Sequence, residues 1–251
     1  MKRLLLASAL FVALSGPAWA GFEEGDEAYG RGDYGAALNE WKPLAQKGDI
    51  QSQYGMGLLY VTGHGVKLNY AEGLAWFKKA AEQGNAKAQF MVGLMYARGR
   101  GVEPDLETAV EWYRKAAKQG FAEAEYNLGV AFDRGKGVPQ DHAKAVEWYK
   151  RAAAQDYVEA QYNLGVSYDL GEGVAEDNAK AVEWYVKAAK KRHAKAQFNA
   201  GLMYLAGEGV KKNYEEAGKW FRRAAAQGLP QANAMLAYMR KAGLEDQEKS
   251  I

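Results

Sequence analysis

The 251-residue sequence contains no cysteine. This absence excludes a disulfide framework and a lipid-attachment cysteine, and it removes the thiolate ligands of structural zinc sites. An H-E-x-x-H segment, which would place two histidines on one helix face around a metal, is also missing. We therefore predict no metal site, and a fold that is held together by packing alone.

Residues that could serve in catalysis are scarce. The histidines are His64, His142 and His193. Each stands at a different place in the repeat pattern described below, where other repeats carry arginine, leucine or phenylalanine, so we expect solvated surface positions. Only three serines follow the first twenty residues, and neither Ser52 nor Ser167 begins an S-x-x-K motif. We predict no catalytic residue, no bound cofactor and no enzymatic activity.

The chain also lacks a surplus of one charge. Lysine and arginine number 33 against 31 aspartate and glutamate residues, and Lys2 and Arg3 account for the difference. A nucleic-acid footprint needs a clustered excess of cations, so no nucleic-acid partner is expected. No apolar run beyond residue 20 approaches the length of a membrane-spanning helix, which predicts no membrane insertion of the mature chain.

The first twenty residues have the pattern of a secretory signal peptide. Lys2 and Arg3 give a positive start, residues 4–14 are apolar, and Ala18-Trp19-Ala20 fits a small-x-small cleavage site. We predict cleavage after Ala20 and a mature chain in the periplasm or outside the cell.

Tryptophan and glycine recur with a period of 36 residues. The positions are Trp76, Trp112, Trp148, Trp184 and Trp220, and Gly57, Gly93, Gly129, Gly165 and Gly201. A fixed period of this length indicates a repeat architecture.

A G-x-G-V segment marks a turn inside each repeat. It begins at Gly63, Gly99, Gly135, Gly171 and Gly207, and three residues after its valine stands Asn69, Asp105, Asp141, Asp177 or Asn213. Glycine permits the positive φ that ends a helix, and Asn or Asp side chains cap the start of the next one. Each repeat is therefore predicted to be a helix, a glycine turn and a capped helix.

Apolar residues inside a repeat recur at helical spacing. Ala145, Trp148 and Ala152 form one stripe of a second helix. A tryptophan that is present in every repeat is expected to pack between helices. For the hydroxyl of Tyr149 two placements stay open, contact with the next repeat and contact with solvent. We predict an all-α fold, an α-solenoid of stacked antiparallel helix pairs.

The ends of the chain depart from the period. We expect a signal peptide at 1–20, a divergent N-terminal helical capping unit at 21–49, five repeats at 50–228, a C-terminal capping helix at 229–243 and a polar tail at 244–251.

Residues 122–155, AEAEYNLGVAFDRGKGVPQDHAKAVEWYKRAAAQ, resemble a Sel-one-like repeat (SLR), a longer relative of the tetratricopeptide repeat. The shared features are A-x-A-x-x-x-L-G, the G-x-G-V turn, an aspartate before the second helix and A-V-x-W-Y-x-x-A-A. The resemblance implies a right-handed superhelix that binds proteins or peptides, and exported bacterial members are often linked to the cell envelope. A cysteine-rich branch is associated with penicillin binding and weak β-lactamase activity, which the lack of cysteine puts in doubt here.

Our first functional hypothesis is a non-catalytic periplasmic or secreted scaffold that binds a protein or peptide partner in cell-envelope homeostasis. Two alternatives stay open: a cell-wall or β-lactam-processing hydrolase, and a secreted effector that acts in a host.

The resemblance also implies where a partner would bind, because the first helices of tetratricopeptide arrays line the concave face. Aromatic and asparagine residues at the fifth and sixth helix positions are Tyr126, Asn127, Tyr162, Asn163, Phe198 and Asn199. A side-chain amide can both donate to and accept from an extended peptide backbone. Alternatively, the aromatics pack between repeats and the asparagines satisfy local groups.

Charged positions of the same helices differ between repeats. The third and fourth repeats contribute Glu123, Asp133, Glu159 and Asp169, with Lys87, Arg98 and Lys195 on either side. An acidic middle would steer a ligand with central basic residues, since exposed charge raises association rate and selectivity. The alternative is a solvated face of mixed charge.

Overall fold

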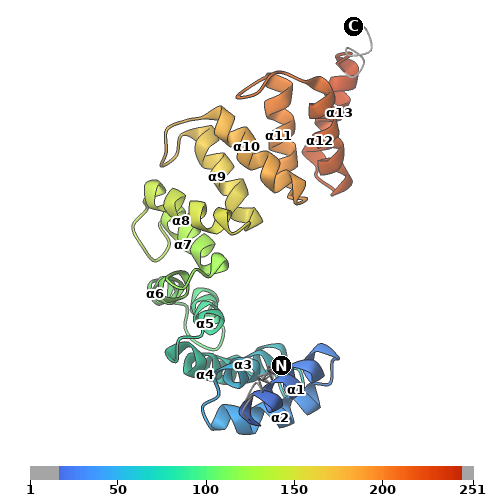
Figure 1. Cartoon of the computed structure of the whole chain (residues 1–251). Helices are drawn as coiled ribbons and strands as arrows, with labels where there is room; N and C mark the ends of the chain where they lie inside the picture. Colours follow the sequence, from blue (N-terminus) through green and yellow to red (C-terminus); the bar gives the residue numbers. More distant parts are fainter. Residues whose placement is uncertain (1–16, 245–251) are drawn as a thin grey trace, which may run out of the picture. The chain divides into compact units, whose positions relative to one another are not determined.

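The structure, a computed structural model, describes residues 17–244 and builds them from α-helices, with no strand in this range (Figure 1). The helices are α1 (Pro17–Gly30), α2 (Tyr34–Gln46), α3 (Ile50–Thr62), α4 (Tyr70–Glu82), α5 (Ala86–Arg98), α6 (Leu106–Ala117), α7 (Ala122–Arg134), α8 (His142–Ala154), α9 (Val158–Leu170), α10 (Asn178–Lys190), α11 (Ala194–Ala206), α12 (Tyr214–Ala226) and α13 (Pro230–Lys241). The predicted all-α fold is confirmed. Of the predicted signal peptide, residues 1–16 lie outside the described part, as does the predicted tail beyond Leu244.

The chain divides into two compact units. The N-terminal unit comprises the residues up to Ala88 together with Arg100–Val102, and the C-terminal unit comprises Gln89–Gly99 and the residues from Glu103 onward. Within each unit a helix packs mainly against the helices that precede and follow it in the chain. Such nearest-neighbour packing is the arrangement of a solenoid. Among the helices described, none combines the length and the apolar character that a membrane span requires.

Each repeat forms the predicted helix, turn and capped helix. In the third repeat α7 ends at Gly135 with φ +63°, and the Asp141 side chain accepts the backbone N–H of Lys144 at 3.0 Å. Equivalent caps form at Asn69, Asp105, Asp177 and Asn213. The second glycine of the turn has a separate purpose, because a Cβ on Gly137 would collide with the backbone of Leu106 in the preceding repeat. The turn therefore ends one helix and also joins two repeats.

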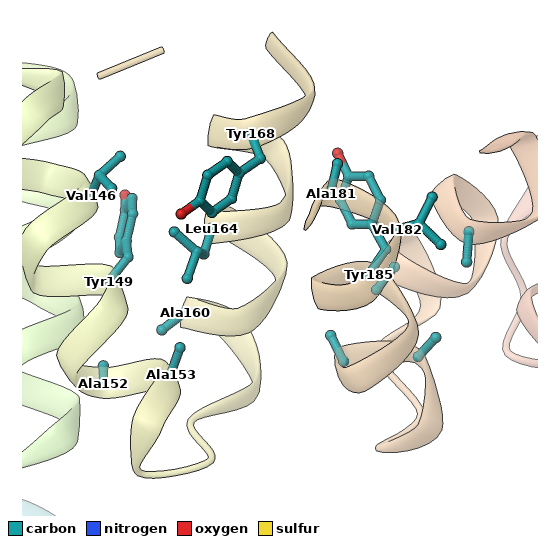
Figure 2. Packing of buried hydrophobic residues seen from close by; sticks show 14 of the residues in the cluster. Val146, Tyr149, Ala152, Ala153, Ala160, Leu164, Tyr168, Ala181, Val182 and Tyr185 are labelled. Carbon is teal, nitrogen blue, oxygen red and sulfur yellow. The ribbon is translucent and has the colours of Figure 1, made fainter. Parts of the chain in front are cut away.

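The core lies between successive helices. Figure 2 shows Val146 and Tyr149 of α8 facing Leu164 and Tyr168 of α9, with Ala153 opposite Ala160. Small alanines let the helix backbones approach one another, and the aromatic rings fill the remaining space between them.

The predicted packing of the tryptophans between helices holds for Trp76 and Trp220, which are 8% and 5% exposed, and needs correction for the three middle repeats. Trp112, Trp148 and Trp184 are only half-buried, and a cation lies over each ring at 3.7, 4.7 and 3.8 Å from the centroid. The aromatic position that is buried in all five repeats is the next one, which holds Phe77, Tyr113, Tyr149, Tyr185 or Phe221. The recurring glycine of the first helix makes room for it, since a Cβ on Gly129 would lie 2.5 Å from the Tyr149 ring. Trp148 instead covers the outer edge of the interface.

Candidate partner-binding face

The predicted partner-binding residues of the last three repeats lie on the first helices α7, α9 and α11 of the C-terminal unit. We call them the first-helix face: Glu123, Tyr126, Asn127, Asp133, Glu159, Tyr162, Asn163, Asp169, Lys195, Phe198 and Asn199. None of them is fully buried. Lys87 and Arg98, both exposed, lie on α5, the former in the N-terminal unit and the latter in the C-terminal unit.

The aromatic residues of this face pack against the second helix of their own repeat and against the residue at its C-terminal junction. The ring of Tyr126 lies 6.0 Å from that of Tyr149 and 5.1 Å from that of Tyr157, the last residue of the same repeat, which precedes α9. The ring of Tyr162 stacks on His193 at 4.5 Å in the same way. Each ring nevertheless stays half-buried, so the ladder supplies junction packing and still offers an accessible edge.

The asparagines act on the tyrosines of the preceding repeat. Burial, and next the negative charge of Glu159, raise the pKa of Tyr126, while hydrogen bonding from Asn163 opposes the rise. Burial likewise raises the pKa of Tyr162, and Asn199 opposes it. These amides thus have local hydrogen-bonding neighbours, as the alternative interpretation of the sequence expected.

Two of the acidic residues share one surface and lack an ion-pair partner. Burial, followed by the charges of Glu159, Tyr126 and Glu123, raises the pKa of Tyr157 to about 12. The Glu123 and Glu159 carboxylates therefore both lie close enough to the Tyr157 phenol to raise its pKa, although they come from neighbouring repeats. Neither Glu123 nor Glu159 forms an ion pair within residues 17–244. Their charge is free to act on a ligand.

The two aspartates of the face have internal partners. Asp169 Oδ2 accepts the hydroxyl of Tyr185 at 2.9 Å. Asp133 Oδ1 instead lies 3.0 Å from His142 Nδ1, at the start of α8. Glu123 and Glu159 are therefore the better candidates for contact with a partner.

The histidines are less solvated than the sequence predicted, although the His142 side chain is still 37% exposed. All three are half-buried. His64 stacks on Tyr34 at 4.0 Å, and His193 Nδ1 accepts the backbone N–H of Ala196, which caps α11. These contacts join groups that lie 30 or more residues apart or that form a cap, so comparing single positions between repeats missed them.

Five consecutive segments match the model of the Sel1 repeat, at residues 50–85, 86–121, 122–157, 158–193 and 194–229. The crystal structure of c5321, a protective antigen of uropathogenic Escherichia coli strains displaying an SLR fold, is 35% identical with a TM-score of 0.87 over 92% of this chain. The chain spans 50% of the length of c5321. A Sel1 repeat protein from Oxalobacter formigenes is 34% identical with a TM-score of 0.81 over 90% of each chain. A search of the curated proteins found no match.

Proposed function

Because this chain belongs to the Sel1 repeat family, we propose that it is a non-catalytic scaffold that holds a protein or peptide partner on the first-helix face. Sel1 repeat proteins are generally protein-interaction scaffolds. Fold alone does not assign function, so the proposal has to be carried by a surface of this chain.

The supporting observation is the unpaired acidic surface around Tyr157. Glu123 and Glu159 both act on this phenol, the half-buried ring of Tyr126 lies 5.1 Å from it, and Asn163 neighbours Tyr126. Aromatic rings with adjacent carboxylates favour an extended segment that carries basic residues, because the charges steer it and the rings supply contact area. We therefore propose a peptide segment with lysine or arginine at its centre as the ligand.

The burial of the serines supports the non-catalytic part of the proposal. Ser52 is 0% exposed and Ser167 is 7% exposed, so neither presents a hydroxyl to a substrate. A nucleophile needs a base within hydrogen-bond reach and an open approach for the reacting group. A hydrolase that used either residue would need the helix pair to open.

We also propose that the scaffold is exported and works in cell-envelope homeostasis, in the periplasm or outside the cell. The support is the signal-like sequence of residues 1–20. Fractionation of cells that express the tagged chain tests this: the mature protein should begin at Gly21 and be released with the periplasm or the medium. Retention of the uncleaved chain in the cytoplasm would refute export.

Binding of a labelled peptide tests the face itself. The probe is a fluorescent twelve-residue peptide with four central lysines, followed by anisotropy at low and at physiological salt. The double variant Glu123→Lys, Glu159→Lys should weaken binding roughly tenfold or more, with the larger effect at low salt. The matched control is Glu147→Lys, Glu183→Lys, which makes the same change of charge at exposed positions of α8 and α10. Equal weakening by both variants would show a non-specific charge effect and would overturn the assignment.

A further inference from the structure

Three potential metal ligands from two repeats meet in the C-terminal unit. Asp133 lies in the last turn of α7, His142 is the first residue of α8, and Glu172 is the middle residue of the turn between α9 and α10. One ligand atom from each lies within 4.8 Å of the other two. We propose that Asp133, His142 and Glu172 bind a divalent transition-metal ion.

The junction between repeats creates this convergence. The backbone of Gly173 packs directly against that of His142, which places Glu172 beside the start of α8. The same register holds in the N-terminal unit, where His64 stacks on Tyr34 at 4.0 Å and the Arg100 guanidinium lies 5.4 Å from the Tyr70 ring centroid. The middle residue of each of these turns thus meets the first residue of the preceding second helix. The stacking of the repeats brings these two positions together, and the residue types at the two positions determine which contact they form.

The spacing suits an ion after a small side-chain movement. Two zinc ligands at about 2.1 Å from the ion and a tetrahedral angle lie about 3.4 Å apart. The Asp133 Oδ1 to His142 Nδ1 distance is 3.0 Å, close to that value. Glu172 is exposed in a turn, so rotation of its side chain can bring its carboxylate within coordination distance. The ion would lie between His142 Nδ1 and Asp133 Oδ1, in place of their direct contact.

A buried hydroxyl beside Asp133 is a second, independent observation. Tyr149 is 1% exposed, and its hydroxyl makes no hydrogen bond of standard geometry within the described chain. Burial, and next the negative charge of Asp133, raise the pKa of this phenol, so the hydroxyl and the Asp133 carboxylate are neighbours. The Asn163 side chain also neighbours the hydroxyl and opposes the rise of its pKa, but it forms no hydrogen bond of standard geometry with it. In the next repeat the equivalent Tyr185 hydroxyl donates to Asp169 at 2.9 Å. With Asp133 Oδ1 on a metal, Oδ2 is free to accept the Tyr149 hydroxyl, the usual orienting contact of a ligating carboxylate.

The donor set selects the class of ion. One imidazole nitrogen with two carboxylate oxygens suits Zn²⁺ and related transition metals, whereas Ca²⁺ and Mg²⁺ prefer oxygen ligands throughout. The side chains of His142 and Asp133 are 37% and 33% exposed, so an ion can enter from solvent and keep a water ligand. A search for H-E-x-x-H could not find this site, because that motif requires ligands on one helix and these three ligands come from separate segments.

The neighbouring repeats are natural controls for the proposed site. One repeat earlier the three equivalent positions hold Ala97, Leu106 and Lys136, which offer no ligand set. One repeat later they hold Asp169, Asn178 and Glu208, so a single change there would complete the set. The chain thus allows both the loss and the gain of a site to be tested on one scaffold.

Calorimetric titration of the untagged protein with Zn²⁺ is the first test. The wild type should bind one equivalent that Ca²⁺ and Mg²⁺ do not displace. His142→Asn, which copies Asn178, and Glu172→Gln should each weaken binding by about tenfold or more, and Tyr149→Phe should weaken it less while keeping one equivalent. Glu208→Gln, the same change one repeat later, should leave both affinity and stoichiometry unchanged.

The gain-of-site variant makes the test decisive. Asn178→His should raise the stoichiometry from one equivalent to two, with circular dichroism used to show unchanged helix content. No zinc binding by the wild type, or an equal affinity in His142→Asn, would overturn the proposal. Displacement of zinc by Ca²⁺ would overturn the assigned ligand chemistry.

Discussion

The third repeat, residues 122–157, and the fourth, residues 158–193, have the same backbone and different polar contacts. Both bury a tyrosine against a first-helix glycine, Tyr149 on Gly129 and Tyr185 on Gly165. The Tyr185 hydroxyl is bonded to Asp169, whereas the equivalent Asp133 turns to His142. The buried packing residues thus determine the backbone that the repeats have in common. The polar residues at the junctions determine which hydrogen bonds and ligand groups each repeat has.

The largest effect should separate the buried tyrosines from the tryptophans beside them. Tyr149→Ala leaves a cavity in the core and should lower the free energy of unfolding by about 3–5 kcal/mol. Trp148→Ala removes a half-buried ring and should lower it by about 1 kcal/mol. Urea unfolding followed by circular dichroism measures both.

Tyr185→Ala extends this comparison to the fourth repeat. It removes the same ring and also the hydrogen bond to Asp169, so it should destabilise by about 1 kcal/mol more than Tyr149→Ala. An equal loss in Trp148→Ala and Tyr149→Ala would contradict the assignment of Tyr149 as the core residue.

The fold could be predicted from the sequence because a periodic pattern reveals the residues that all repeats have in common. The 36-residue spacing, the G-x-G turns and the Asn or Asp caps predict the helix pairs that are observed. Adjacent aromatic residues were harder to place, since Trp148 and Tyr149 both lie near the apolar stripe and only the contact with Gly129 decides which one is buried.

The candidate sites could be predicted only in part. Positions on the first helix follow from the repeat register, so Glu123 and Glu159 could be named beforehand. The pairing of His142 with Asp133, and the approach of Glu172 from the next repeat, depend on how the repeats stack. A rule that pairs the turn residue of one repeat with the first residue of the preceding second helix would have found this set.

A smaller effect should appear as a pH dependence at the end of the fourth repeat. Burial lowers the pKa of His193 below its usual 6.5, with Lys195 acting in the same direction and Glu159 opposing. The folded state then takes up a proton less readily than the unfolded state, so its stability is fully present above pH 6.5 and falls as the pH drops toward the folded pKa. Protonation also removes the Nδ1 acceptor that caps Ala196.

The variant His193→Asn should reduce this dependence, because Asn caps without titrating and already does so at Asn85 in the N-terminal unit. We expect the wild type to lose up to about 1 kcal/mol more than the variant between pH 7.5 and pH 5 in urea unfolding. Tyr157→Asn, the equivalent change in the third repeat, should leave the pH dependence of the wild type unchanged. An identical pH dependence in the wild type and His193→Asn would exclude this histidine as its source.

The smallest effect concerns a ladder of paired glutamine side chains that the third and fourth repeats interrupt. Pairs of glutamine side chains are bonded at 2.7–2.8 Å: Gln83 to Gln53, Gln119 to Gln89 and Gln227 to Gln197. In the third repeat Gln155 donates instead to Glu125, which is 4% exposed. Burial raises the pKa of this carboxyl, while Gln155 and Arg151 oppose the rise.

A raised folded pKa means that the folded state binds a proton more readily than the unfolded state, so stability is lost as the pH rises above the unfolded value of 4.5. Glu125→Gln should therefore stabilise the protein at pH 7 by about 0.5 kcal/mol, and this gain should vanish toward pH 4. The reverse change in the fourth repeat, Gln161→Glu, should destabilise it, since it removes the amide that donates to Asp156 at 3.1 Å and places a second carboxylate beside Asp156. Lys191, which lies 2.6 Å from the Asp156 carboxylate, should offset part of this loss. Thermal unfolding of the pair at both pH values compares the two repeats directly. A loss of stability in Glu125→Gln at pH 7 would show that the carboxylate is a favoured partner of Arg151 rather than a buried charge in an amide position.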